Sequence, residues 1–197
     1  FNAYAYTSAE NLLAGLPRRA PLSSELEQVI REWVTLCRGF SAWDRFNHDQ
    51  AFQILRTVQS QVVPQWIFLK RLTEHIRSTG YEPVIDLVRN AERRASRGRY
   101  DDAVARLYRA LERLAQTRLK QRSPALDSSN LDLTLLPEGL RSQYEKKQGE
   151  GLTEGGDDTI KLGLLEDYVL LAKLGDPVGE VFISLQNSLL DVLARRN

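Results

Sequence analysis

The chain has 197 residues, of which 42% are hydrophobic, and its formal net charge is +1 at pH 7. This length and composition can supply one substantial core, so we expect one domain over residues 1–197, or one domain with an extended appendage. No apolar run is long enough to span a bilayer, and nothing resembles a signal peptide. The single cysteine excludes an internal disulfide and favours an intracellular protein.

The residue types that bind metals and cofactors are sparse. The chain has two histidines and one cysteine, and its carboxylates are not clustered at ligand spacing, so we predict no bound metal and no cofactor. It has neither a glycine-rich phosphate loop nor a Gly-x-Ser-x-Gly elbow. The sequence begins at Phe1 and contains no methionine, so we expect it to be a fragment of a longer protein.

Charge is distributed unevenly along the chain. Residues 89–122 contain eleven Lys or Arg and four Asp or Glu, a net charge of +7. Residues 126–180 contain five Lys or Arg and twelve Asp or Glu, a net charge of −7. The small overall charge therefore conceals a basic segment and an acidic segment, which can bind separate partners or each other.

Four helices are predicted within the first eighty residues. Each of the first three has two polar residues at the spacing of an N-terminal cap. These pairs are Thr7 with Glu10, Ser24 with Glu27, and Asn47 with Gln50. The fourth helix is predicted to begin at Pro64 and to end near Gly80.

Three residues in this part are candidates for chemistry. Cys37 lies on an apolar stripe, which favours a small core residue over a reactive thiol. His48 stands at a helix start, where a catalytic or metal-binding role competes with capping or with packing beside Trp43 and Phe46; we favour the structural role. His75 is interpreted as a surface residue at a helix C-terminus, where partial positive charge is favourable.

The best-defined pattern lies between Pro83 and Arg122. Apolar residues recur every three or four positions on both sides of Gly98, which gives each half one apolar helical face. Pro83 suits the first turn of a helix, and Gly98 suits the left-handed position that ends one. We therefore predict an antiparallel helical hairpin with a basic outer surface, around which the rest of the chain is organised.

The C-terminal part is predicted to continue with helices. We expect an irregular stretch over 126–136, a short helix from Pro137 to about Lys147, a flexible acidic loop over 149–158 and a helix over 161–174. Gly175, Asp176 and Pro177 then supply a stop, an N-cap and a first-turn proline for the last helix. No strand pattern has comparable strength, so the predicted fold class is all-α, a compact multi-helix domain around the central hairpin.

One interpretation of the hairpin is a tetratricopeptide-like helix pair. Small residues between Ala91 and Ala110 match the positions at which such helices pack closely. Tyr108 matches the aromatic residue that fills the gap between the two helices. A solenoid needs several repeats to bury its faces, and no second copy occurs at the expected period. The match therefore indicates hairpin packing without a repeat array.

A second resemblance extends over nearly the whole chain. It rests on six blocks, of which Arg99–Glu112 is the most specific: Trp43–His48, Asn90–Arg94, Gly98–Glu112, Leu133–Pro137, Leu174–Asp176 and Arg196-Asn197. In these blocks the chain resembles the C-terminal helical domain of CRISPR-associated CARF proteins, the ancillary effectors of type III systems. The resemblance implies a HEPN-like domain, often a metal-independent ribonuclease, preceded by an N-terminal CARF domain that senses cyclic oligoadenylate.

The resemblance also implies which residues are catalytic. The family signature is an arginine, commonly followed by Asn, with a histidine four to six positions downstream. Arg196 and Asn197 resemble its first two residues and lie on the last helix. The sequence ends one residue after Arg196, so the expected histidine is not part of it.

Residues of the central helix are candidates for binding RNA. Arg106, Arg109 and Arg113 lie three and four apart, so they form one ridge that can line a phosphate path. A solvated basic face is the competing interpretation, because Arg is a good helix former. Tyr108 and Glu112 are possible accessory residues, with His48; Tyr108 belongs to the apolar stripe, and Glu112 has the spacing to pair with Arg109.

We therefore expect a prokaryotic, cytoplasmic effector domain of antiviral defence. It would cleave single-stranded RNA as a homodimer once cyclic oligoadenylate is bound elsewhere in the parent chain. We expect no association with a membrane. The alternative is a non-catalytic helical interaction module, whose basic hairpin binds an acidic partner or its own acidic segment. RNA affinity that falls with salt would favour the first interpretation.

Overall fold

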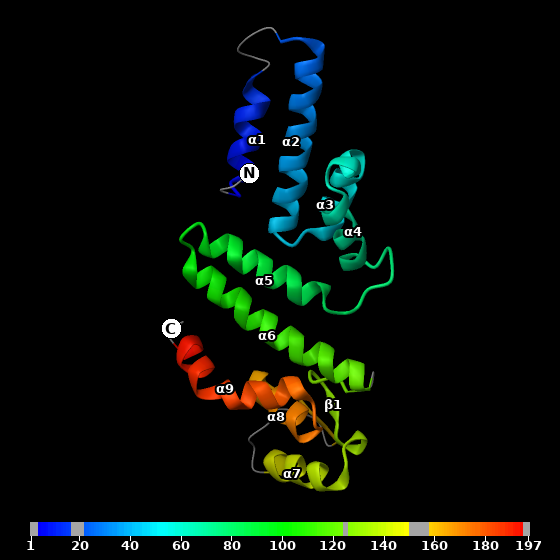
Figure 1. The fold of residues 1–197 in the computed structure, drawn as a ribbon. Helices are drawn as coiled ribbons and strands as arrows, with labels where there is room; N and C mark the ends of the chain where they lie inside the picture. The colour runs from blue at the N-terminus through cyan, green and yellow to red at the C-terminus, as the bar shows by residue number, and fades with distance from the viewer. Residues whose placement is uncertain (1–3, 17–21, 124–125, 150–157, 195–197) are drawn as a thin grey trace. The chain divides into compact units, whose positions relative to one another are not determined.

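The computed structural model describes residues 4–16, 22–123, 126–149 and 158–194, with side chains up to Gln186. Within these ranges the fold is built from nine α-helices and one two-stranded ribbon (Figure 1), so the prediction of an all-α fold is confirmed. The chain divides into two compact units. Unit 1 comprises residues 1–82 and 92–98, and unit 2 comprises residues 83–91 and 99–197. The single functional domain expected from composition stays a prediction.

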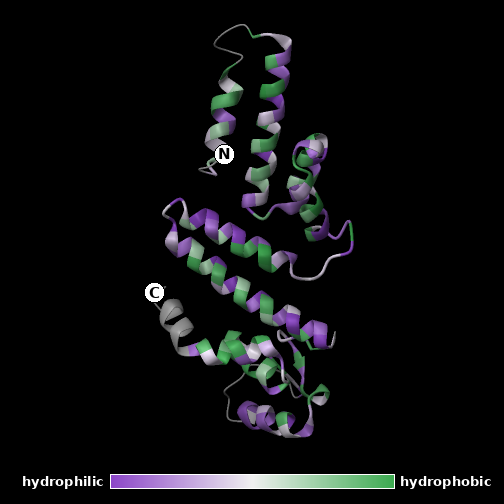
Figure 2. Ribbon diagram, viewed as in Figure 1, coloured by the Kyte–Doolittle hydropathy of each residue, from purple (hydrophilic) through white to green (hydrophobic). Residues whose placement is uncertain are grey.

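Unit 1 is a set of packed helices. It contains α1 (Tyr6–Gly15), α2 (Ser24–Asp44), α3 (His48–Leu55), the 3-10 helix η2 (Arg56–Gln61) and α4 (Val63–Leu72). Helix α2 packs against α1 and α3, and α3 packs against α4. The core is rich in aromatic side chains, with Phe52 stacked on Trp66 at a centroid distance of 4.5 Å. Figure 2 shows that hydrophobic and hydrophilic residues alternate along these helices, as expected for amphipathic elements.

The predicted caps of unit 1 have mixed outcomes. Asn47 caps α3 by accepting a hydrogen bond from the Gln50 N–H, as predicted. The cap of α2 is Ser23, one residue before the predicted Ser24, and it accepts from the Leu26 N–H. The predicted Thr7 cap is wrong, because α1 begins at Tyr6 and the Thr7 hydroxyl contacts Ser41 Oγ at 3.2 Å instead.

Helix α4 is shorter than predicted. It ends at Leu72 and not near Gly80. The Glu82 carboxylate accepts hydrogen bonds from the Thr79 backbone N–H and from the Ser78 and Thr79 hydroxyls, which fix a non-helical turn before the next helix. His75 is exposed, and its ring stacks on Phe52 at 4.0 Å. The observed end of α4 therefore lies three residues before His75, so the predicted position of His75 at a helix C-terminus is wrong.

Two helices connect the units along the chain. Helix α5 (Glu82–Ala95) contributes its residues 83–91 to unit 2 and its remaining residues to unit 1, and α6 (Tyr100–Arg122) belongs to unit 2. Gly98, between them, has φ +71°, a conformation that favours glycine, which confirms the predicted turn. Helix α6 is the central element of unit 2, because it packs against both α8 and α9.

The rest of unit 2 follows α6. It contains β1 (Leu131–Asp132), the 3-10 helix η3 (Leu133–Leu135), α7 (Glu138–Gly149), β2 (Thr159–Ile160), α8 (Leu164–Lys173) and α9 (Pro177–Ala194). Strands β1 and β2 are antiparallel, with Leu131 opposite Ile160. Sequence analysis did not predict this ribbon, which is too short to produce an alternating pattern. Most of the predicted loop over 149–158 lies outside the described residues.

Candidate nucleic-acid interface

The two predicted catalytic residues, Arg196 and Asn197, lie outside the described residues. Helix α9, which leads to them, is described as far as Ala194. Several contacts position this helix within unit 2, and its beginning follows the predicted signals. Gly175 has φ +69°, and the Asp176 carboxylate accepts from the Val178 N–H at 3.0 Å, so the predicted stop and N-cap are confirmed.

Asp176 also attaches α9 to α6. Its side chain is completely buried, and its Oδ2 accepts from Arg118 Nη2 at 2.6 Å and lies 3.8 Å from Arg122 Nη1. Burial alone would raise the pKa of Asp176. The hydrogen bonds from Arg118 and from the Val178 N–H outweigh that effect and hold the pKa below its ordinary value. The carboxylate is therefore charged in the folded protein, and the first turn of α9 is held against two arginines of α6.

Aromatic packing and a close backbone approach position the same helix. Phe182 of α9 stacks on Tyr168 of α8 with a centroid distance of 3.8 Å, and the Tyr168 hydroxyl donates to the Leu111 carbonyl at 2.9 Å. At Gly179, an added Cβ would overlap the backbone nitrogen of Ala172 and lie 2.7 Å from the carbonyl carbon of Leu171. Glycine at this position thus lets α9 lie directly on the backbone of α8.

The predicted arginine ridge on α6 contains two kinds of residue. The side chain of Arg106 is 20% exposed, donates to Asn90 Oδ1 of α5, and forms an ion pair with Asp102 at 2.9 Å. Asn90 is completely buried. Arg106 therefore links α5 to α6 within unit 2, which is a structural task that the spacing alone did not reveal.

Arg109 and Arg113 are exposed on α6. Arg109 is 60% exposed and pairs with Glu112 at 2.7 Å, so the predicted pairing of Glu112 is confirmed. The same helical face continues to Lys120, which is 51% exposed and pairs with Asp127 at 2.9 Å. We call Arg109, Arg113 and Lys120 the α6 basic stripe. Lys120 was missed by sequence analysis, although its spacing of seven residues from Arg113 is the signal that could have found it.

The remaining candidate residues, Tyr108, His48 and Cys37, make packing contacts within their units. Tyr108 is partly buried and packs against the core of unit 2, in agreement with its place in the apolar stripe. His48 is the first residue of α3 in unit 1, and its ring makes an edge contact with Phe46 at 5.9 Å. Cys37 is fully buried, and burial raises the pKa of its thiol, as expected for a core residue. RNA contact by Arg106, Arg109 and Arg113, and catalysis by Arg196 and Asn197, stay predictions.

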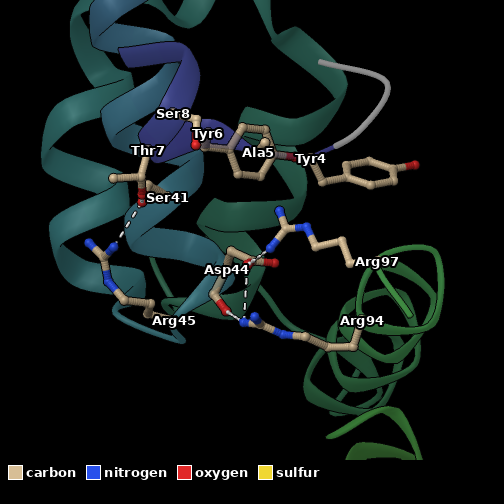
Figure 3. Close-up of a pocket in the computed structure, with 10 residues that line it drawn as sticks. All are labelled: Tyr4, Ala5, Tyr6, Thr7, Ser8, Ser41, Asp44, Arg45, Arg94 and Arg97. Atoms are coloured by element: carbon tan, nitrogen blue, oxygen red, sulfur yellow. Dashed lines mark hydrogen bonds and ion pairs between the residues drawn. The ribbon is translucent and has the colours of Figure 1, made fainter. Parts of the chain in front are cut away.

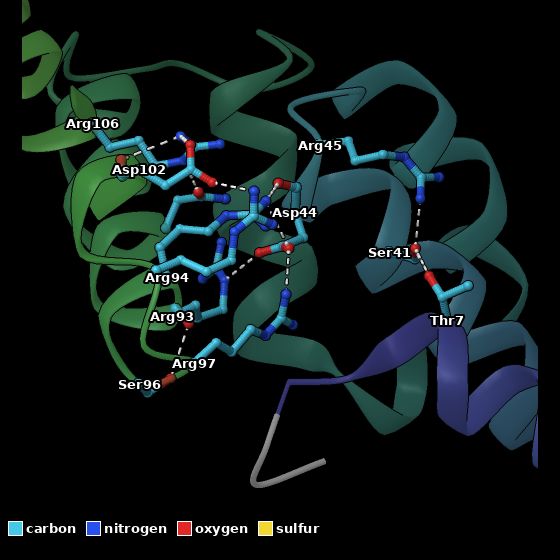
Figure 4. A network of polar contacts seen from close by, with 12 residues as sticks. Thr7, Ser41, Asp44, Arg45, Arg93, Arg94, Ser96, Arg97, Asp102 and Arg106 are labelled. Carbon is cyan, nitrogen blue, oxygen red and sulfur yellow. Dashed lines mark hydrogen bonds and ion pairs between the residues drawn. The ribbon is translucent and has the colours of Figure 1, made fainter. Parts of the chain in front are cut away.

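A second arginine cluster lies in unit 1 and was not predicted. The Asp44 side chain is 8% exposed and forms ion pairs with Arg93 at 2.8 Å, Arg94 at 3.0 Å and Arg97 at 3.4 Å (Figure 4). Arg94 also donates to the Asp44 carbonyl. The residues come from the Trp43–His48 and Asn90–Arg94 blocks and the turn after them, about fifty positions apart. A charged residue on an otherwise apolar stretch, Asp44 after Trp43, was the available signal.

The described residues also bear on metal binding and on membrane spanning. No group of three or more His, Cys, Asp or Glu residues there is arranged to hold a metal ion. None of the helices in the same ranges has the length and apolar character needed to cross a membrane.

The all-α fold is consistent with a HEPN-like domain, the class that the resemblance implies. A family model described as the Csm6 HEPN domain matches residues 72–197, and one described as the Csm6 6H domain matches residues 1–80. The first match covers more than half of the chain, so the chain belongs to the Csm6 HEPN domain family. The protein is thus CRISPR-associated and of prokaryotic type. No curated protein and no solved structure gives a significant match.

Proposed function

We propose that the chain is the effector part of a metal-independent RNA endonuclease in CRISPR-based antiviral defence. Its activity on single-stranded RNA is controlled by cyclic oligoadenylate, bound by a CARF domain outside the present sequence. It acts in the prokaryotic cytoplasm as a homodimer, in which two catalytic motifs share one groove. The observation that carries the proposal is the HEPN match over residues 72–197, because it includes α6, α9 and the Arg196-Asn197 pair.

The proposed chemistry uses the 2′-hydroxyl of the RNA as the nucleophile. Arg196 contacts the scissile phosphate and offsets the negative charge that develops there, for which a bidentate guanidinium is well suited. A histidine after Asn197 moves the proton, since imidazole titrates near neutral pH. Asn197 positions that histidine. No metal takes part in this scheme.

The α6 basic stripe is the proposed RNA track on unit 2. Exposed arginines bind phosphate oxygens and release counterions, so their contribution weakens as salt rises. Arg109 and Arg113 take this role. Arg106, whose guanidinium is engaged by Asn90 and Asp102, contributes by holding α5 and α6 together.

The proposal is tested by ribonuclease assays on the full-length protein. Cleavage of a single-stranded RNA is measured with and without cyclic oligoadenylates and in the presence of EDTA. Arg196→Ala should abolish cleavage, whereas its neighbour Arg195→Ala, which removes the same charge one position away, should retain most of it. Cleavage should persist in EDTA.

Two outcomes would contradict the proposal. One is cleavage that survives Arg196→Ala, which would remove the catalytic assignment. The other is the absence of cleavage under every activator condition, together with RNA affinity that does not respond to salt. The second result would support the interaction module, for which the pairing of Arg118 and Arg122 with Asp176, and of Lys120 with Asp127, already provides acidic partners within unit 2.

A further inference from the structure

Tyr168 connects three helices of unit 2 through one side chain. It belongs to α8, and it is buried. Its hydroxyl donates to the Leu111 carbonyl of α6 at 2.9 Å, and its ring stacks on Phe182 of α9 with the two ring planes 7° apart. The helix that carries the α6 basic stripe and the helix that leads to Arg196 are therefore joined by the same tyrosine.

The accepting carbonyl lies between two residues of the α6 basic stripe. Leu111 follows Arg109 by two residues and precedes Arg113 by two, so it belongs to the same stretch of helix as both arginines. A carbonyl oxygen has two lone pairs, of which the helix uses one for the N–H four residues later, here that of Ala115. The second accepts from the Tyr168 hydroxyl. This hydrogen bond thus fixes α8 against α6 at the level of Arg109 and Arg113.

The stack on Phe182 holds α9 at a point from which small movements grow along the helix. Phe182 is buried, and it lies one turn after Gly179, where α9 meets the backbone of α8. From Phe182 to Ala194 the helix continues for twelve residues, or about 18 Å. A tilt of about 3° at Phe182 would move the far end by about 1 Å, and a misplacement of about 1 Å near reacting groups can reduce a rate roughly a hundredfold.

We propose that Tyr168 is a positioning residue, which sets the separation between the α6 basic stripe and the part of α9 that leads to Arg196. Its hydroxyl holds α6 and its ring holds α9, so the loss of either contact changes how these two helices lie relative to each other. The effect on turnover rests on the proposed ribonuclease function, whereas the effect on helix separation does not. Tyr168 acts through the helices, because its side chain is buried.

Tyr144 of α7 provides a matched control. Both tyrosines are 1% exposed, and both belong to the core of unit 2. The Tyr144 hydroxyl has no hydrogen-bond partner among the described residues, whereas the Tyr168 hydroxyl binds α6. Tyr144→Phe and Tyr168→Phe therefore remove the same group from the same core, and only Tyr168→Phe removes a bond between helices. Both variants keep the ring and its packing.

The first test compares these variants in the cleavage of single-stranded RNA by the full-length protein in the presence of cyclic oligoadenylate. Tyr168→Phe should lower kcat about tenfold and change KM by less than about twofold, because Arg109 and Arg113 stay exposed and still bind RNA. Tyr144→Phe should leave both constants as in the wild type. Phe182→Leu removes the stack and keeps the hydrogen bond, and it should also lower kcat without raising KM. Thermal unfolding verifies that each variant is folded at the assay temperature.

The second test measures helix separation without cleavage. Nitroxide labels on Arg113→Cys of α6 and Leu185→Cys of α9, both at exposed positions, give an electron spin resonance distance in the full-length protein. The labels are placed in a Cys37→Ala background, and labelled protein is diluted with unlabelled protein so that only distances within one chain are measured. Tyr168→Phe should shift or broaden the distance distribution, and Tyr144→Phe should not.

The outcomes separate this proposal from the proposed function. If the wild type does not cleave RNA, the proposed function fails, and the distance comparison alone decides whether Tyr168 positions the helices. An equal kcat for Tyr168→Phe and Tyr144→Phe in an active enzyme, or an unchanged distance in Tyr168→Phe, would overturn the positioning role. A loss confined to KM would overturn it as well, because Tyr168 would then act on RNA binding.

Discussion

Each unit contains a buried aspartate that is bound by arginines, but the two sites differ in what surrounds the carboxylate. Asp176 in unit 2 is completely buried, meets Arg118 and Arg122, and also caps α9. Asp44 in unit 1 meets three arginines and borders a cavity. The Asp176 carboxylate holds the start of α9 against α6. The Asp44 carboxylate gathers three arginines at the edge of a cavity within unit 1 (Figure 3).

The largest expected effect on stability comes from removing the Asp176 carboxylate in unit 2. Asp176→Ala removes the buried carboxylate that Arg118 binds and leaves α9 without its cap, so we expect a loss of roughly 3–5 kcal/mol in the free energy of unfolding, measured by urea denaturation. Asp176→Asn keeps the cap and should lose less. Asp158→Ala, an exposed aspartate of the same unit, should change stability by less than about 0.5 kcal/mol. A loss as small as that of Asp158→Ala would refute the anchoring role.

A third buried aspartate, Asp167, differs from Asp44 and Asp176, because no arginine of the described residues forms an ion pair with it. Asp167 is buried, its Oδ1 has no hydrogen-bond partner within those residues, and burial raises its pKa to about 7, aided by the nearby carboxylates of Glu112, Asp127 and Glu166. The folded state then binds a proton that the unfolded state releases between pH 3.8 and about 7. Stability should therefore decline as pH rises through this window, by up to roughly 4 kcal/mol.

The pH dependence of Asp176 has the opposite sign. Its lowered pKa means that its contribution is present above pH 3.8, the ordinary value, and is lost as pH falls below it. Urea denaturation from pH 4 to 8 isolates the Asp167 effect. Asp167→Asn should flatten the decline between pH 4 and 7, and an unchanged slope in this variant would show that another group titrates.

Gly179 in unit 2 and Gly39 in unit 1 both lie where an added methyl group would meet other atoms, but the atoms differ. Gly179→Ala in α9 places a methyl group against the backbone of α8, which cannot move without shifting the helix, so we expect a loss of roughly 1–3 kcal/mol in spite of the better helix propensity of alanine. At Gly39 in α2 the added methyl meets only the side chain of Leu55. Gly39→Ala should therefore cost less, with both variants measured by urea denaturation. Equal losses would indicate that the α8 backbone yields as readily as a side chain.

The sequence predicted those features that depend on local signals. The Gly98 turn and the Gly175–Pro177 junction were both confirmed, because each contains a glycine in the left-handed conformation, and the second also has the Asp176 cap. The end of α4 was missed because the Glu82 carboxylate binds Ser78 and Thr79, three and four positions before it, and these hydrogen bonds form a non-helical turn in spite of the helical pattern. The cap of α2 was predicted one residue too late, and the cap predicted for α1 is absent, although both helices form.

The candidate sites were less predictable, because they depend on which distant residues meet. Spacing along one helix identified Arg106, Arg109 and Arg113 but could not separate the arginine that binds Asn90 and Asp102 from the two that face solvent. The Asp44 cluster joins positions about fifty residues apart, and no periodicity records such a contact. The α6 basic stripe and the Asp44 cavity could be defined only after the helices were placed within their units.

The smallest effects on stability, and the most selective effects on binding, are expected on α6. Arg109→Ala and Arg113→Ala should each change the free energy of unfolding by less than about 0.5 kcal/mol, since both side chains are exposed. Each should lower the slope of log affinity for single-stranded RNA against log salt concentration by about one. Arg106→Ala should do the reverse: it should lose roughly 1–3 kcal/mol of stability, because it removes a hydrogen bond to the buried Asn90 and the ion pair with Asp102, and it should change the salt slope little. If Arg106→Ala changed the salt slope as much as Arg109→Ala, all three arginines would share one RNA track, and the division between a structural and a binding arginine on this helix would be wrong.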